Sequence, residues 1–419
     1  MPTTEVRASP RQGVAAASAA ALVVTATALV AASGRLATAG GRDQKNYHYP
    51  TIEELQRLFP SIDIVNVQTA TSPLFHLLVS WASIPLGSSL FVTQILGSIF
   101  AAALVAVLVN FVWPIESPGL RALVLAPLLL SAYFWQSTLW LNTDVAAILW
   151  VTLAIVTLLR AESIQDFAVV GAFCSLAVAT RQTAIWLLVP VVAVALVGWR
   201  GRPLIVRVVA GCMPAGVILL ALLVTWGGLT PPAFAVKNND VTSYAAVSYG
   251  FAVLALLVVP LVWASVVHVS RRQVAIAATV GGVAALPAML FPSAANSASR
   301  TGGWVWSLVA HTPDIAGRSP LLIVGAFIGG FAGYLVVSAL DWRVGKVLAS
   351  SFIALCLTLT AGSDLFQRYF ELPAALLFVL AAQNLAESGH IVRRLPLLGL
   401  AAAQCVLLVG VVAAPLVSA

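Results

Sequence analysis

Apolar runs long enough to cross a membrane recur along the whole chain, separated by mostly short polar intervals. A transmembrane helix needs about 20 apolar residues, and backbone groups inside a bilayer must bond to one another, so these runs predict helices. The pattern therefore predicts an all-α, polytopic integral membrane protein that forms a single domain over residues 1–419. Twelve or thirteen spans are expected, at 14–33, 88–112, 122–140, 144–160, 166–180, 183–199, 204–226, 245–268, 273–291, 319–339, 347–361, 368–386 and 396–416.

The longest polar interval, residues 34–87, separates the first two expected spans. Long loops of this kind are usually functional or disordered, and the aromatic, proline and helix-forming residues of this one favour function. Its apolar stretch 73–85 is too short to cross a bilayer and begins and ends with proline, which predicts an interfacial or re-entrant helix. The run 14–33 resembles a signal peptide, because Ala37-Thr38-Ala39 resembles a cleavage site, but its length favours a retained helix.

Basic residues divide the loops into two groups. With the N-terminus in the cytoplasm, 13 of the 22 Lys and Arg residues lie on short cytoplasmic loops, as the positive-inside rule expects. The opposite side carries the long loops 34–72, 227–244 and 292–318, which contain both acids and bases. The net charge of +7 is therefore assigned to membrane topology and not to nucleic-acid binding, and the outer face is the expected working surface.

Composition restricts the chemistry further. Charged residues make up only 9% of the chain, against about 25% in soluble proteins. The four cysteines lie in apolar runs without metal-site spacing and are expected as small packing residues. No glycine-rich phosphate loop and no Gly-x-Ser-x-Gly motif is present, which gives little support to nucleotide binding or serine hydrolysis. No cofactor and no metal ion is expected.

Two acids on the expected outer side are candidates for proton transfer. Asp43 follows the first span closely, and the neighbouring Arg42 and Lys45 favour its ionised form. An ionised carboxylate suits a general base, whereas the alternative is a solvated loop acid. Asp144 opens the fourth expected span, where it is either an N-cap or a functional acid at the membrane.

Two outer arginines are candidates for binding phosphate. Arg181 has very little loop around it, so it either faces a polar cavity or extends to the lipid headgroups. Arg368 either forms a surface ion pair with Glu371, three residues away, or contacts an anionic ligand. Further candidates for the same cavity are Tyr47, His48, Gln182, Lys237, Asp364, Gln367 and Tyr369. His48 and His76 are too far apart in the sequence to be interpreted as a metal pair, and His76 is expected as a packed or interfacial residue.

Several short motifs resemble one family. The order of a first span, a long outer loop with an early acid, a short apolar helix and many further spans resembles the GT-C class of membrane glycosyltransferases. The motifs resemble the dolichyl-phosphate-glucose α-1,2-glucosyltransferase family and its bacterial relatives. They are Asp43, Tyr47-His48-Tyr49-Pro50, Thr69-Ala70-Thr71-Ser72-Pro73-Leu74-Phe75-His76, Arg181-Gln182-Thr183 and Gln367-Arg368-Tyr369. Gln44 and Ala184 depart from the family pattern, which usually has a second acid and an asparagine there.

The resemblance implies a polyprenyl-phosphate-sugar donor whose lipid lies between helices, with transfer to a hydroxyl of a lipid-linked glycan or another acceptor. Asp43 would be the base, Arg181 and Arg368 would hold the phosphate, and a single displacement would invert the anomeric carbon. Such an enzyme would lie among the lipids of a bacterial plasma membrane with its active site facing outside. Two alternatives remain open: a secondary transporter or lipid flippase, disfavoured by the lack of an internal repeat, and a structural or assembly protein.

Overall fold

The computed structural model describes residues 10–36, 38–197, 201–235, 242–266, 269–292, 302–361, 365–391 and 393–418. In this part of the chain the regular elements are all helices, accompanied by two isolated backbone bridges. The first half contains α1 (Pro10–Ser33), α2 (Ala39–Asp43), the π-helical turn η1 (Gln44–His48), α3 (Tyr49–Leu58), α4 (Leu74–Ser83), η2 (Ile84–Leu86), α5 (Leu90–Phe111), α6 (Pro118–Leu129), α7 (Ala132–Leu139), α8 (Asp144–Arg160), α9 (Ile164–Thr180), η3 (Gln182–Leu187) and α10 (Leu188–Ala195).

The second half continues the helical pattern. It contains α11 (Arg202–Trp226), α12 (Pro232–Ala235), α13 (Ala245–Ala264), α14 (Arg271–Leu290), α15 (Trp304–His311), α16 (Pro320–Ala339), α17 (Trp342–Thr358), η5 (Leu359–Ala361), α18 (Arg368–Glu387), α19 (Leu395–Leu408), η6 (Val409–Ala413) and α20 (Ala414–Ser418). Within the described residues, nine helices are long and apolar enough to cross a membrane, or ten if the bent pair α6 and α7 forms one span. The predicted all-α, multi-pass membrane architecture is therefore confirmed.

Among the described residues, fewer helices than predicted are long and apolar enough to be counted as spans, for a geometric reason. The expected spans at 144–160 and 166–180 correspond to α8 and α9, which have 17 residues each. At 1.5 Å per residue they extend about 26 Å, short of the roughly 30 Å hydrocarbon core. The expected span 183–199 is η3 followed by the eight-residue α10, and the expected span 122–140 is bent by 66° between α6 and α7.

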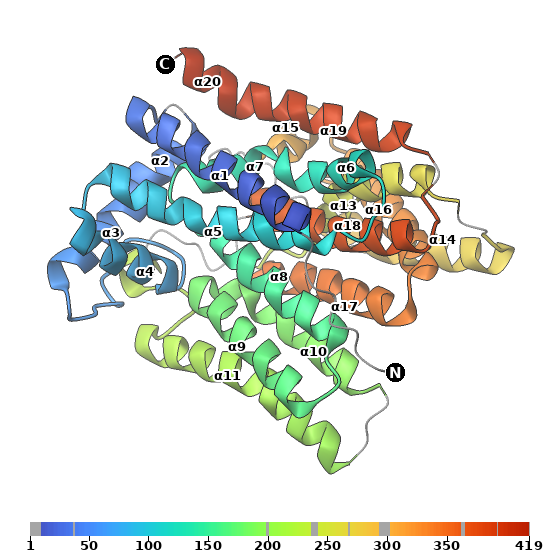
Figure 1. Ribbon diagram of the computed structural model, residues 1–419. Helices are drawn as coiled ribbons and strands as arrows, with labels where there is room; N and C mark the ends of the chain where they lie inside the picture. Colours follow the sequence, from blue (N-terminus) through green and yellow to red (C-terminus); the bar gives the residue numbers. More distant parts are fainter. Residues whose placement is uncertain are drawn as a thin grey trace.

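Helix α18 lies at the centre of the bundle, and the outermost helices surround it (Figure 1). In the most apolar 18 residues of α18, 89% are buried, against 17% for α1 and for α11. Close packing between helices uses glycine: a Cβ at Gly329 on α16 would overlap the backbone oxygen of Phe251 on α13. Small residues of this kind let membrane helices approach closely. The centre of the bundle is thus protein-lined, while α1 and α11 present apolar side chains outward.

The segment between α1 and α5 is folded and contains α2, η1, α3 and α4, which gather at one end of the molecule (Figure 1). Ile52 on α3 and Phe75 on α4 pack with Leu141 in a small core separate from the main one. The short apolar helix predicted at 73–85 is confirmed as α4 and η2. This end of the molecule brings the polar interval against the beginnings of α8 and α18.

Candidate active site

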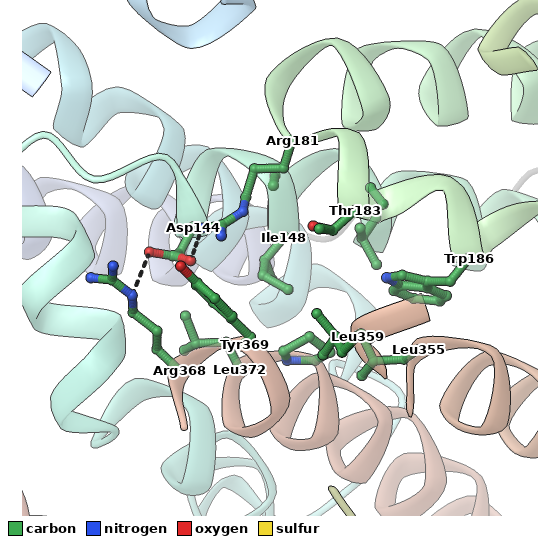
Figure 2. Close-up of a pocket in the computed structure, with 14 residues that line it drawn as sticks. Asp144, Ile148, Arg181, Thr183, Trp186, Leu355, Leu359, Arg368, Tyr369 and Leu372 are labelled. Atoms are coloured by element: carbon green, nitrogen blue, oxygen red, sulfur yellow. Dashed lines mark hydrogen bonds and ion pairs between the residues drawn. The ribbon is translucent and has the colours of Figure 1, made fainter. Parts of the chain in front are cut away.

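Four charged residues that are far apart in the sequence meet in one network. Arg181 donates a hydrogen bond through Nη1 to Asp144 Oδ1. Arg368 donates through Nη1 to Asp43 Oδ2 at 2.8 Å, and its Nε lies 3.9 Å from Asp144 Oδ2. The charges therefore alternate in a row from Asp43 through Arg368 and Asp144 to Arg181. Figure 2 shows Asp144 between the two guanidinium groups.

All four residues lie where helices begin or end. Asp43 is the last residue of α2, directly before the π-helical turn η1, an irregularity often found at functional sites. Asp144 and Arg368 are the first residues of α8 and α18, and Arg181 follows α9 in an extended conformation. The positive end of the α8 dipole favours a carboxylate at Asp144. Arg368 is a cation at the positive end of the α18 dipole, which is unfavourable. The carboxylates of Asp43 and Asp144 beside it offset this repulsion.

The side chains of these ion pairs are largely buried, which raises the energetic cost of removing one partner. The side chains of Asp144 and Arg181 are only 7% and 12% exposed, and those of Arg368 and Asp43 are 19% and 27% exposed. Removing one partner of a buried pair leaves an uncompensated charge, which is far more costly than losing a surface pair. The network therefore holds its charges in place and keeps their sum at zero.

Three alternative interpretations of these residues are wrong. Asp144 does not cap α8: the N-cap residue is Thr143, which makes no side-chain capping bond, and the carboxylate of Asp144 pairs with Arg181. Arg368 does not form a local surface pair with Glu371, because its partners are Asp43 and Asp144. The ion pair of Arg181 likewise replaces the expected alternative of extension to the headgroups.

A pocket opens beside this network and combines a charged end with an apolar wall (Figure 2). Asp144, Arg181 and Arg368 form the charged end. The apolar wall comes from α8, η3, α17, η5 and α18 and includes Ile148, Val151, Ala184, Trp186, Leu355, Leu359 and Leu372. The pocket has a cavity volume of about 40 Å³, which is room for a few water molecules. A larger ligand must enter through the open side or displace side chains.

Tyr369 lies beside both arginines. The guanidinium carbon of Arg181 is 4.5 Å from the centre of the Tyr369 ring, and that of Arg368 is 5.5 Å away. Arg368 also lies 5.0 Å from the ring centre of Phe366. Arginine over an aromatic face is electrostatically favourable, so these rings help to hold both guanidinium groups at the pocket.

Gln182 has a structural role in the arrangement. Its Oε1 accepts hydrogen bonds from the backbone and hydroxyl of Ser72 at 3.0 and 3.1 Å. Its Nε2 donates to the backbone oxygens of Ala70 and Leu229 at 2.7 and 2.9 Å. All four bonds tie neighbouring loops together next to Arg181, so the predicted cavity residue Gln182 supports the pocket and does not line it.

Two other predicted residues, Gln367 and Tyr47, contact other segments of the protein and do not line the pocket. Gln367 accepts from the backbone of Val305 at 2.9 Å and donates to Glu371 Oε2 at 2.7 Å. Tyr47 packs edge to face with Phe234, with ring centres 5.7 Å apart. Both therefore connect segments around the site: Gln367 joins α18 to α15, and Tyr47 joins η1 to the segment after α11.

Of the remaining predicted residues, two are not described by the structure and one is buried beside a second histidine. Lys237 and Asp364 lie outside the described residues. His48 is buried, and its Nδ1 lies 2.9 Å from Nε2 of His76. Burial, with the nearby Arg368 and Arg181, lowers the pKa of His48 to about 3, and burial also lowers the pKa of His76.

Sequence reasoning missed two features of this region. The pairing of His48 with His76 joins η1 to α4 across 28 residues, for which a single sequence has no signal. Glu371 is buried and accepts from Ser131 at 2.8 Å as well as from Gln367. The spacing of Gln367 and Glu371 is i,i+4, a helical neighbour relationship that could have indicated their bond.

The described residues contain no group of three or more His, Cys, Asp or Glu side chains placed to hold a metal ion. Comparison of the chain with protein-family models, with curated proteins and with solved structures finds no match. A function must therefore be argued from the chemistry of the charged network and its pocket.

Proposed function

We propose that this protein is a membrane glycosyltransferase that moves a sugar from a polyprenyl-phosphate donor to an acceptor hydroxyl. The observation that carries the proposal is a pocket in which Arg181, Arg368 and Asp144 meet an apolar wall, with the carboxylate of Asp43 bonded to Arg368 beside it. Guanidinium groups match phosphate oxygens, and an apolar wall suits an isoprenoid chain. A ligand with a charged head and an apolar tail matches the chemistry of both halves and would extend through the open side of the pocket.

The reaction is a single displacement. The acceptor oxygen forms a bond to the anomeric carbon while the bond from that carbon to the phosphate oxygen breaks. The acceptor proton passes to the carboxylate of Asp43, and the bonding electrons leave with the polyprenyl phosphate. Arg181 and Arg368 stabilise the charge that develops on the phosphate, an effect that is strong where water is scarce. The configuration at the anomeric carbon is inverted.

Arginine geometry allows the phosphate to share the guanidinium groups with the carboxylates. Each guanidinium has five N–H donors, whereas Arg181 and Arg368 each use one N–H in the hydrogen bonds to Asp144 and Asp43. A phosphate can therefore be bound while the carboxylates hold the guanidinium planes in place. We assign the site to the outer side of a bacterial plasma membrane, because the basic loops on the opposite side fit a cytoplasmic location.

A lipid transporter or flippase is the second candidate, since the same amphipathic pocket suits a lipid phosphate that is carried and not cleaved. A carrier has no need for a proton acceptor at Asp43, so base-dependent transfer separates the two functions.

The test uses the purified full chain in lipid nanodiscs, with a panel of polyprenyl-phosphate sugars and acceptor glycolipids. We expect sugar transfer by the wild type and loss of transfer in Asp43→Asn. Glu54→Gln on the exposed face of α3 is the matched control, since it makes the same chemical change outside the network. Donor binding without transfer, followed by donor movement across liposomes, would favour the carrier.

A further inference from the structure

Two buried histidines, His48 and His76, form a hydrogen bond, and the donor and the acceptor can be deduced from their surroundings. His48 ends η1 and His76 lies in α4, with 7% and 1% of their surfaces exposed. Nδ1 of His48 lies 2.9 Å from Nε2 of His76. The rings are nearly parallel, at 13°, with centres 5.2 Å apart. Facing ring nitrogens at this distance form an N–H···N hydrogen bond, so one nitrogen carries the proton and the other accepts it.

Asn142 decides which nitrogen carries the proton. Its side chain lies next to the ring of His48, and because Nδ1 of His48 faces His76, Nε2 is the ring nitrogen left for Asn142. Nδ2 of Asn142 donates to the backbone oxygen of Gln136 at 3.2 Å. Oδ1 of Asn142 is buried and, within the described residues, has no hydrogen-bond partner. Buried acceptors need donors, so Nε2 of His48 carries the proton and Nδ1 accepts from Nε2–H of His76.

The chain of bonds ends on the turn that presents Asp144. The hydroxyl of Ser137 donates to the backbone oxygen of Asn142 and accepts from the backbone N–H of Val145, both at 3.0 Å. Leu141 begins this turn with φ of +55°, a left-handed conformation that is unfavourable for a side chain with a Cβ. A turn with this strain keeps its shape only when surrounding contacts determine it.

We propose that His76, His48 and Asn142 form a hydrogen-bonded relay of positioning residues that sets Asp144 between Arg181 and Arg368. None of the three relay residues is among those lining the pocket, so they act through Asp144 and do not touch a ligand there. The relay also anchors the last residue of η1, the turn that begins next to Asp43. The inference rests on the proposed function only for its kinetic test.

The first test is nitrogen NMR of the wild-type full chain in nanodiscs with ¹⁵N-labelled histidine. The chain has five histidines, so the signals can be assigned with single substitutions, including the exposed His311→Phe as a control. We expect His48 and His76 to be neutral, each with its proton on Nε2, and a measurable coupling between the paired nitrogens. Protonation of His48 on Nδ1, absence of the coupling, or shifts typical of metal-bound imidazole would overturn the relay.

The second test compares two substitutions of His76. The amide of glutamine places a donor near the Nε2 position, so His76→Gln keeps the bond to His48, whereas His76→Phe removes it. We expect His76→Phe to reduce kcat about 10–100-fold, the size of effect that slight misplacement of a reacting group produces, and His76→Gln to recover most of the loss. Equal rates in both variants would contradict positioning. If the wild type transfers no sugar, the proposed function fails while the NMR experiment still judges the relay.

Discussion

Two ion pairs of the same chemistry occupy opposite environments in this molecule. Arg57 and Glu54 lie one turn apart on α3, joined by two hydrogen bonds of 2.9 and 2.6 Å, and their side chains are 68% and 48% exposed. Arg181 and Asp144 come from different helices and are 12% and 7% exposed. Water screens the first pair, so it contributes little. The second pair is shielded, so each charge depends on its partner.

The first pair follows from helix geometry alone, whereas the second pair forms only when several helices pack together. An exposed i,i+3 pair needs only two suitable residues on one helix. The pair between Arg181 and Asp144 requires the beginning of α8 and the end of α9 to lie at the same level, and Arg368 adds the beginning of α18. Substitutions at the two places should therefore differ strongly in effect.

The largest effect is expected at Asp43. We predict that Asp43→Asn reduces sugar transfer by about 10²–10⁴-fold, because asparagine cannot accept a proton. Donor binding should persist, since both arginines remain. Initial rates of radiolabelled transfer and equilibrium donor binding measure the two quantities separately. A loss of less than about tenfold in Asp43→Asn would fall well short of that expectation. If Asp144→Asn is inactive at the same time, the base is Asp144.

The next largest effect is expected at Arg181. Arg181→Ala leaves Asp144 with only the longer contact to Arg368, and we predict a loss of about 3–5 kcal/mol in unfolding free energy together with weak donor use. Arg181→Lys should recover part of both, because a lysine keeps the charge but loses the planar fork. Denaturant unfolding in detergent and donor titration provide the measurements.

The matched control for Arg181 is Arg57→Ala, which removes the same side chain from the exposed pair and should change stability little. A double-mutant cycle of Arg181→Ala with Asp144→Ala should show strong coupling, because the two residues are in direct contact. Equal effects of Arg181→Ala and Arg57→Ala would mean that the buried network is not holding the helices together.

A smaller effect concerns pH. The folded-state pKa of His48 is lowered from 6.5 to about 3 by burial and by Arg368 and Arg181, and burial also lowers that of His76. The unfolded chain therefore binds more protons, so stability is complete above pH 6.5 and falls as the pH decreases towards 3. His48 contributes about 1.4 kcal/mol per pH unit within that window, and His76 acts in the same direction.

Thermal unfolding between pH 7 and pH 4.5 tests this dependence. His48→Gln should have a shallower decrease in Tm than the wild type, although it is less stable at pH 7, whereas the exposed His311→Gln should have the wild-type slope. An unchanged slope in His48→Gln would show that His48 does not titrate in this manner.

The same contrast explains what the sequence alone could predict. Apolar runs identified the helices, and loop charges selected Asp43, Asp144, Arg181 and Arg368 as candidates, all of which the structure brings together. Each of these signals is local: a run of residues, or one charge next to a helix end. Exposure and partner could not be predicted, because Asp43 and Arg368 are separated by 325 residues.

Other features depend on the packing of several elements. The bond between His48 and His76 exists only because α3 and α4 fold against each other. One of the two alternatives for Arg368 placed Glu371 in a surface ion pair, but Glu371 is buried because α18 is surrounded on all sides. Periodicity is of little use there, since a helix that is apolar all round has no face that distinguishes lipid from protein.

The smallest effect is expected where the exposed pair is altered, which makes that position suitable for testing orientation. Arg57→Cys on α3 and Arg202→Cys at the start of α11, each in a background without the four native cysteines, should have near-wild-type activity, because both native side chains are exposed. With an impermeant maleimide on intact cells, we expect position 57 to be labelled and position 202 to be labelled only after the membrane is permeabilised. This follows from the short basic loops, which the positive-inside rule assigns to the cytoplasm. Labelling of position 202 from outside would reverse the orientation and place the charged network on the cytoplasmic side, where a donor sugar facing outward could not reach it.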